Sequence, residues 1–256
     1  MLLVFDIGNT NITIGVFEED SLMKTFRIDS DKNLSLTGYE VLLKNCCADL
    51  CVKECVIGSV VQELTPIINT ACKNIFGCVP FVFKPHTDCG IKIVVQNPDK
   101  VGVDRIANSF VAKIKYQLPA IVVDIGTAIT FDIVSKKGDF IGGVIMPGID
   151  LQLKSLSVNT SKLPKIEVAT SEKTIGDSTS GAILSGVIRG TASAIEGLIS
   201  RCEDELGEKA TIIATGGQSR VISQYMTRKF DYLDHSLTLE GLRFLYEYDR
   251  RLLISD

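Results

Sequence analysis

One pattern of apolar and polar positions occurs twice along the chain. An apolar run passes into an acidic, glycine-containing turn at residues 6–8, and the same Asp-Ile-Gly turn returns at residues 124–126, 118 residues later. Two further apolar runs separated by polar turns follow each copy, which predicts three consecutive strands joined by hairpins. These runs occupy residues 12–17 and 22–28 in the first copy and residues 129–134 and 140–146 in the second. The repeat predicts an internal duplication of one structural unit.

Helical and strand patterns alternate after each triplet of strands. Residues 36–50, 64–76 and 102–116 carry apolar side chains at helical spacing, and the short apolar runs at 54–61 and 79–83 are typical of buried strands. In the second half, the predicted elements are a helix over 177–204, a strand with a glycine turn over 210–217 and a helix over 238–248. Meandering strands followed by strand–helix alternation are typical of an α/β fold.

Two domains of similar size follow from the duplication. The chain has 256 residues, of which 45% are hydrophobic, and this is enough to bury a sizeable core. The boundary is expected near residues 117–119, so the predicted domains are 1–117 and 118–256.

The charge balance argues against nucleic acid or a membrane as a partner. The chain has 27 Lys and Arg against 31 Asp and Glu, for a net charge of -4, and no basic run. The first residues lack the basic segment of a signal peptide. No apolar stretch is expected to reach the length of a membrane span. A cytoplasmic protein is therefore expected.

The eight cysteines fit a reducing compartment, where they serve mainly as small apolar side chains. Four of them cluster at Cys46, Cys47, Cys51 and Cys55. A metal site in this cluster is the less favoured alternative, because the spacing matches none of the usual zinc patterns.

Each acidic turn has the residue types of a phosphate site. Gly8 lets the backbone approach a ligand closely, and residues 9–11 add backbone N–H groups and side-chain donors. Asp6, at the carboxyl end of its predicted strand, can hold a divalent cation directly or through water. A single turn of this kind often only closes a hairpin, but the second copy at Asp124 favours phosphate binding. We expect the two loops to clamp a polyphosphate and its metal.

A third candidate site lies in residues 97–105, NPDKVGVDR, at the start of a predicted helix. The N-terminus of a helix favours anions, and Arg105 can hold a carboxylate in a bidentate fork. Asp104 can accept a hydrogen bond from a substrate hydroxyl. An ion pair between Asp104 and Arg105 at the helix start explains the same residues equally well. The glycine turn at 214–219 suits a nucleotide, but a plain strand–helix turn explains it nearly as well.

An ordered set of motifs resembles the type III pantothenate kinases over nearly the whole chain. The motifs are DIGNTN at 6–11, NPDKVGVDR at 97–105, DIGTAITFD at 124–132, GGVIMPGI at 142–149, KLP at 162–164, IGDST at 175–179, ATGGQS at 214–219 and LTLEGL at 237–242. The resemblance implies two duplicated ribonuclease H-like domains of the actin and acetate kinase superfamily, with mixed sheets flanked by helices. It also implies ATP-dependent phosphorylation of pantothenate to 4'-phosphopantothenate, the first step of coenzyme A biosynthesis.

The resemblance implies a role for each matched residue. Asp104 would be the catalytic proton acceptor, Asp124 would bind K⁺ or NH₄⁺, and Asp6 would bind the divalent cation, usually Mg²⁺, that accompanies ATP. The implied ATP contacts are Asp6, Ile7, Gly8, Asn9, Thr10, Asn11, Ile12, Thr13 and Thr127. The implied pantothenate contacts are Gly102, Val103, Asp104, Arg105 and Thr179.

The resemblance further implies a homodimer. Gly186, Gly190 and Ala194 lie four residues apart on the predicted helix 177–204. This small-residue stripe serves either packing within the chain or a dimer seam. One departure concerns Val95, which stands where many members of the family have a tyrosine, so a tyrosine contact to pantothenate is not expected.

Rival functions are less well supported. A two-metal nuclease of ribonuclease H type would need a basic groove, which the acidic balance does not provide. A regulatory factor without catalytic activity is less favoured, because it would not require the intact charged residues of the three motifs. An actin-like or chaperone ATPase is also less favoured, because the small size of the chain leaves little room for a peptide-binding domain. A Ser-His or Cys-His hydrolase is not expected, because neither His86 nor His235 lies in a nucleophile pattern.

Overall fold

The structure is a computed structural model that describes residues 1–47, 49–84, 89–158, 163–164 and 166–255. His86 and the lysine of the KLP motif, Lys162, lie outside the described residues.

The chain divides into two compact units. Unit 1 comprises Met1–Ile114 and Ser236–Asp256, and unit 2 comprises Lys115–His235. The first boundary lies within three residues of the predicted one, but the C-terminal helix belongs to unit 1 rather than to the second half. Periodicity predicts that helix but carries no information on which sheet it covers.

Unit 1 contains one five-stranded sheet with the order β3-β2-β1-β4-β5. The first three strands are antiparallel, and β4 and β5 run parallel to β1. The elements are β1 (Leu2–Ile7), β2 (Asn11–Glu18), β3 (Ser21–Asp29), α1 (Leu36–Cys47), β4 (Glu54–Ser59), α2 (Thr65–Phe76), β5 (Phe81–Val82), the 3₁₀ turn η1 (Pro98–Lys100), α3 (Val103–Lys115) and α8 (Leu237–Ser255).

Unit 2 repeats the arrangement, with the sheet order β8-β7-β6-β9-β10 and the same strand directions. The elements are β6 (Ala120–Ile125), β7 (Ala128–Val134), β8 (Phe140–Pro147), α4 (Ile149–Val158), α5 (Thr179–Leu184), the π-helical turn η2 (Ser185–Arg189), α6 (Gly190–Leu206), β9 (Thr211–Thr215), α7 (Ser219–Ser223) and β10 (Tyr232–Leu233). Corresponding strands occupy corresponding places in the two sheets, which confirms the predicted duplication and the α/β class.

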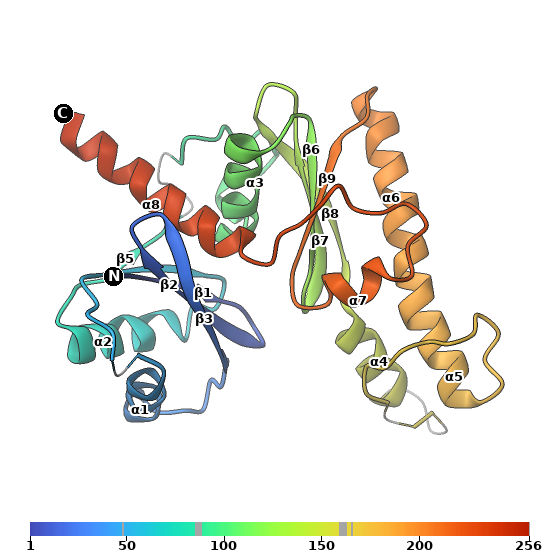
Figure 1. The fold of residues 1–256 in the computed structure, drawn as a ribbon, viewed down its shortest axis with the longest axis horizontal. Coiled ribbons are helices and arrows are strands. Elements are labelled where there is room, and N and C mark those ends of the chain that lie inside the picture. The colour runs from blue at the N-terminus through green and yellow to red at the C-terminus, as the bar shows by residue number, and fades with distance from the viewer. Residues whose placement is uncertain (48, 85–88, 159–162, 165, 256) are drawn as a thin grey trace. The chain divides into compact units, whose positions relative to one another are not determined.

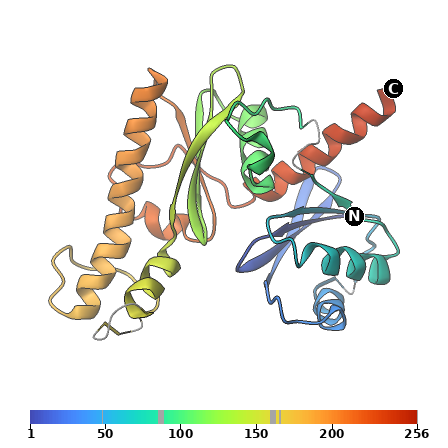
Figure 2. The same cartoon turned by 180° about the vertical axis from the view of Figure 1, so that it is seen from behind.

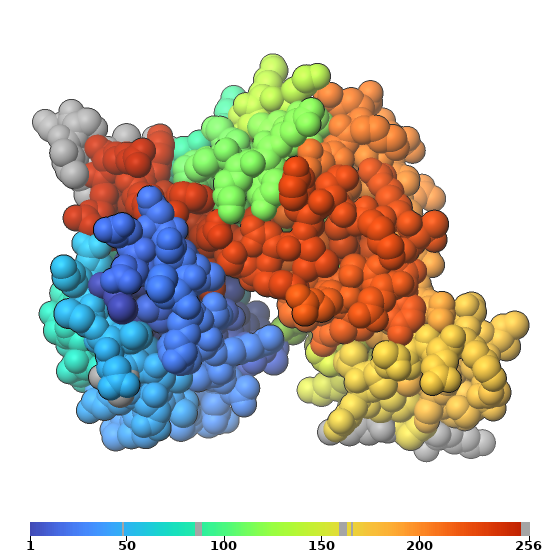
Figure 3. Space-filling view, viewed as in Figure 1, coloured from blue at the N-terminus to red at the C-terminus, as the bar shows by residue number. Residues whose placement is uncertain are grey.

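The sheet of unit 1 is covered on both faces. Its alternating side chains Leu3, Phe5 and Ile7 are fully buried in one cluster with residues of α1 and α2. Helix α8 packs on the opposite face, against β1 and β4 (Figures 1 and 2). Gly58 makes this approach close, since a Cβ there would lie 2.4 Å from the Leu242 side chain. Figure 3 shows the red C-terminal segment lying against the blue N-terminal one within this unit.

The core of unit 2 lies between its sheet and the long helical segment α5–η2–α6. Val123, Ile125 and Phe131 are fully buried in one cluster with Ile188 and Ile195. Figure 1 shows α6 running along the sheet. The sequence predicted the strands from their apolar runs and a helix over residues 177–204, whereas the packing of that helix on the sheet is known only from the structure.

Most predicted elements are confirmed, with small differences at their ends. The helix expected over 36–50 ends at Cys47, and the helix expected over 238–248 runs from Leu237 to Ser255. The sequence analysis did not identify α4, α7 or the two-residue strand β10. α4 is short and α7 covers only five residues, so neither provides enough turns for a clear helical period.

One expectation about membrane spans was wrong. Among the described residues, the stretch Thr179–Leu206 is long and apolar enough to cross a membrane by length and composition alone, and 39% of its most apolar part is buried inside the protein. The core helix of a globular unit passes the same test. Val187, Ala192 and Ile199 pack in the core cluster of unit 2, as such a helix requires.

Candidate functional site

The first acidic turn joins β1 to β2. The Gly8 N–H donates to the Asn11 carbonyl at 3.0 Å, and the Ser30 hydroxyl donates to the Gly8 carbonyl at 2.6 Å. Asp6 lies one residue before the end of β1, opposite Thr13 of β2. These bonds fix the turn from inside unit 1, while Asn9 and Thr10 are exposed. The turn therefore presents polar groups at the edge of the sheet, as the sequence predicted.

The second turn joins β6 to β7 in the same way but is one residue shorter. The Gly126 N–H donates to the Ala128 carbonyl at 3.1 Å, two residues on rather than three. Asp124 again lies one residue before the end of its strand, opposite Thr130. Thr127 is exposed at the tip of the turn. The shorter turn leaves less backbone to wrap a phosphate than residues 8–10 provide.

Two glycines from other motifs hold the second turn in place. A Cβ at Gly216 would lie 2.4 Å from Asp124 Oδ1 and 2.6 Å from the Ile125 backbone. A Cβ at Gly148 would lie 2.2 Å from the Gly126 carbonyl oxygen, and the Gly148 N–H donates to the Thr127 carbonyl at 3.0 Å. The glycines of the ATGGQS and GGVIMPGI motifs therefore allow these loops to pack directly on the acidic turn.

The surroundings of Asp124 fit a hard cation. Thr130 of β7 and Thr215 of β9 are its direct partners in the sheet on either side, so the three side chains share one face. A carboxylate and two hydroxyls are oxygen donors, which hard cations prefer. Asp6 has only one such neighbour, Thr13, because its partner in β4 is Gly58. Thr130 and Thr215 were not predicted from the sequence, because they become neighbours of Asp124 only once the strands are paired.

The third motif forms the start of α3. Gly102 precedes the helix, and its carbonyl accepts the first helical hydrogen bond from the Ile106 N–H at 3.1 Å. Asp104 Oδ1 accepts from the Arg105 N–H at 2.9 Å, so this carboxylate folds back over the helix N-terminus. A Cβ at Gly102 would lie 2.3 Å from that oxygen. The glycine of the motif is thus required by the position of the Asp104 side chain.

Burial raises the pKa of the Asp104 carboxyl above its usual value, although the Arg105 N–H and charge act in the opposite direction. Burial favours the neutral form of a carboxyl group. A carboxylate with a raised pKa is a better proton acceptor than an exposed one. Such a shift beside a sheet edge is typical of a functional site.

The first and third motifs meet at one edge of unit 1. β1 and β4 are parallel, so Asp6 lies level with Gly58, and the Val60 N–H donates to the Ile7 carbonyl at 3.1 Å. Val60 also lies beside Gly102, where a Cβ would be 3.5 Å from Val60 Cγ1. The carboxyl ends of β1 and β4 and the N-terminus of α3 therefore converge within this unit.

Some predicted contacts are restricted to the backbone. Ile7 and Ile12 are fully buried and Val103 is 3% exposed, so these side chains face the core. Their backbone groups alone are available to a ligand. Gly8, Asn11, Thr13 and Arg105 are partly exposed.

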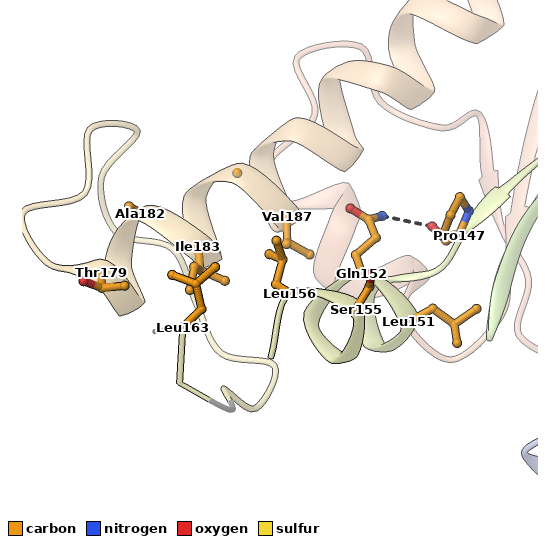
Figure 4. Close-up of a pocket in the computed structure, with 11 residues that line it drawn as sticks. Pro147, Leu151, Gln152, Ser155, Leu156, Leu163, Thr179, Ala182, Ile183 and Val187 are labelled. Carbon is orange, nitrogen blue, oxygen red and sulfur yellow. Dashed lines mark hydrogen bonds between the residues drawn. The ribbon is translucent and has the colours of Figure 1, made fainter. Parts of the chain in front are cut away.

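Thr179 lies in unit 2, where it is the first residue of α5 and is exposed. It borders a cavity of about 580 Å³ between α4 and the α5–η2 segment. Figure 4 shows Thr179 at one end of this cavity, and Gln152 further along donates to the Pro147 carbonyl at 2.9 Å. Leu151, Leu156, Ile183 and Val187 make the lining mainly apolar.

His235 approaches a serine in unit 2, with 3.4 Å between Nδ1 and the Ser219 hydroxyl oxygen. That serine is fully buried and donates to the Gly216 carbonyl at 2.7 Å. A buried hydroxyl engaged with the backbone is not placed to attack a substrate, so the pair supports the glycine turn.

The predicted cysteine cluster is only partly buried. Cys47 and Cys55 are buried, Cys46 is intermediate and Cys51 is exposed. Across the described part of the chain, no group of three or more His, Cys, Asp or Glu side chains is placed to hold a metal ion.

Comparisons with known proteins match the chain to one enzyme family. The type III pantothenate kinase family model matches residues 2–201. The type III pantothenate kinase of Exiguobacterium sibiricum is 38% identical over 255 residues, which cover 98% of this chain and 100% of that protein.

Two solved structures resemble the fold. One, from Campylobacter jejuni, is described as a Baf family transcriptional activator, with a TM-score of 0.64, 22% identity and coverage of 97% of this chain and 99% of that one. The other, the activator of 2-hydroxyisocaproyl-CoA dehydratase from Clostridium difficile with bound ADPNP, has a TM-score of 0.55, 11% identity and coverage of 100% and 97%. These likenesses concern the fold alone and agree with the predicted α/β architecture over nearly the whole chain. On its family match and its identity to curated relatives over nearly the full chain, this protein belongs to the type III pantothenate kinase family.

Proposed function

We propose that the protein transfers the γ-phosphoryl group of ATP to the primary hydroxyl of pantothenate, giving 4'-phosphopantothenate for coenzyme A biosynthesis. The observation that carries the proposal is the occurrence of Asp6 and Asp124 at the same place in two sheets of the same strand order, in a chain of this family. Phosphoryl transfer depends mainly on positioning and on neutralising charge, which paired acidic turns with a bound cation provide.

The geometry at the edge of unit 1 supports the roles proposed here for its residues. Asp6 holds the divalent cation that accompanies ATP, and the backbone N–H groups of residues 9–11 contact the phosphates. Asp104 orients the pantothenate hydroxyl and accepts its proton, which its raised pKa favours. Arg105, in the first turn of α3, anchors the pantothenate carboxylate. The divalent cation, when bound, neutralises negative charge on the phosphates.

In unit 2 we assign Asp124 to a monovalent cation, K⁺ or NH₄⁺, and Thr127 to a contact with ATP. Thr130 and Thr215 add oxygen donors beside Asp124. Thr179 contacts pantothenate in this scheme.

The proposal includes a cytoplasmic homodimer. Gly186, Gly190 and Gly197 lie on one exposed face of the η2–α6 segment, where an added Cβ would meet no atom within 4 Å. Such a face lets a second helix approach closely. Sedimentation equilibrium at working concentration tests it, and a monomer would contradict it.

The decisive assay is pantothenate-dependent release of ADP by the purified protein. We expect turnover with ATP, Mg²⁺ and K⁺, and little turnover when Na⁺ replaces K⁺ or when pantothenate is omitted. Mass spectrometry identifies the phosphorylated product. A rate of ADP release that is the same with and without pantothenate would refute the proposed substrate.

A further inference from the structure

Three thiols lie together in unit 1, away from the acidic turns. Cys55 is in β4 and Cys78 follows α2, and their sulfur atoms are 3.3 Å apart. The neighbouring Cys72 of α2, together with burial, raises the pKa of the Cys55 thiol. Cys55 and Cys72 are buried, whereas Cys78 is partly exposed. The cluster therefore has one accessible thiol with a buried thiol in contact behind it.

The backbone holds the two closest thiols beside each other. β4 pairs with β5 so that Val56 lies opposite Phe81; Cys55 directly precedes Val56, and Cys78 lies three residues before Phe81 in the segment that leads into β5. A disulfide bond is about 2.05 Å long, so the sulfur atoms need to approach by about 1.2 Å. Cys78 follows Gly77, the left-handed cap at the end of α2, and precedes β5, so it lies in a short connecting segment that can shift this far.

A cavity gives a small oxidant access to this pair. It has a volume of about 490 Å³ and is lined by both thiols together with Pro80, Phe81 and Tyr246. At its rim, Arg250 contacts Glu54 and lies over the Tyr246 ring. A hydroperoxide is small enough to enter and reach the Cys78 sulfur.

We propose that Cys55 and Cys78 are a site of reversible disulfide formation by hydrogen peroxide. The Cys78 thiolate attacks one peroxide oxygen and the O–O bond breaks. The departing hydroxide takes a proton and leaves as water, and Cys78 becomes a sulfenic acid. The Cys55 sulfur then attacks the Cys78 sulfur, the S–O bond breaks, and the Cys55 proton leaves with the oxygen as a second water. The two thiols together give up two electrons to the peroxide.

The environment sets the speed of this reaction. Burial and the neighbouring Cys55 raise the pKa of the Cys78 thiol to about 12. Since the thiolate is the nucleophile, oxidation is slow at neutral pH. Its rate rises about tenfold for each unit by which the pH increases, as long as the pH is below that pKa. The contact with Cys55 ends the reaction at a disulfide, which thiols reverse, before Cys78 reaches the irreversible sulfinic state.

The test uses the full-length protein treated with hydrogen peroxide, alkylated under denaturing conditions and digested. We expect the loss of two alkylatable thiols, a peptide that links Cys55 to Cys78, and recovery of both thiols after dithiothreitol. The rate of linkage should rise about tenfold between pH 8 and pH 9. The exposed Cys51 provides the matched control, because Cys51→Ser should leave the linked peptide unchanged while Cys78→Ser abolishes it.

Mapping in the unmodified chain keeps the test valid even if a variant fails to fold. A linked peptide that joins any other pair of cysteines would overturn the proposal. So would conversion of Cys78 to sulfinic acid with Cys55 still reduced, or full retention of both thiols after prolonged treatment at pH 9.

Discussion

Replacing Gly216 by alanine tests how the glycine turn supports Asp124. The new Cβ would lie 2.4 Å from Asp124 Oδ1 and 2.6 Å from the backbone N and C of Ile125. Gly216 also has a positive φ of 86°, which an alanine adopts only with strain. The substitution therefore has two effects, one on the backbone and one on the carboxylate.

The two effects have different magnitudes and different readouts. The left-handed backbone costs about 1–2 kcal/mol of folding stability. To restore an ordinary contact of 3.4–4 Å from 2.4 Å, Asp124 or the turn must shift by about 1.0–1.6 Å. A displacement of this size at a reacting site costs about 100-fold in rate. We expect Gly216→Ala to lose about 100-fold in turnover and to need more K⁺ for half-maximal activity.

Gly207 is the matched control. It has a similar φ of 73° at the end of α6, but a Cβ there would meet nothing within 4 Å. Gly207→Ala should lose only the about 1–2 kcal/mol of the left-handed backbone in urea unfolding, without the further loss from overlap at Gly216, and should keep its turnover and its K⁺ dependence. If both variants have the same activity and the same half-saturating K⁺ concentration, Gly216 does not position Asp124.

Three further substitutions test the assigned roles. Asp104→Asn should lose about 10²–10⁴-fold in turnover while still binding ATP in calorimetry, and full turnover of this variant would contradict the role of Asp104 as proton acceptor. In the unmodified protein, kcat/KM should fall as the pH drops through the raised pKa of Asp104. Arg105→Ala should raise the KM for pantothenate about 10–100-fold with a smaller change in kcat, and an unchanged KM would contradict the carboxylate anchor. Glu203→Gln should lower the free energy of unfolding by about 2 kcal/mol at pH 7, because the buried carboxylate accepts two hydrogen bonds at 2.7 Å from Arg228, which itself is about one-third exposed. These partners lower the pKa of Glu203 to about 2, so its contribution is complete above its ordinary pKa and is lost as pH falls toward 2. The difference in free energy of unfolding between the variant and the unmodified protein should therefore shrink at about pH 3.5, and a difference independent of pH would contradict the ion pair. As a control, Glu208→Gln removes an exposed ion pair with Lys136 and should change stability by less than about 0.5 kcal/mol.

The sequence by itself determined the elements and their duplication. The apolar runs around Phe5 and Val123 and the helical period of residues 177–204 depend on the local order of side chains, which the sequence gives directly. The acidic turns could be identified for the same reason, since an aspartate and a glycine at a strand end form a local motif.

Only the tertiary structure decided how distant segments support those motifs. The register that places Thr130 and Thr215 beside Asp124 depends on strand pairing, and the contact of Gly216 with the same carboxylate depends on a loop about 90 residues away in the chain. The assignment of α8 to unit 1 likewise depends on its packing against β1 and β4. Such contacts form between surfaces that meet only after the sheets assemble, so no local period or motif in the sequence encodes them.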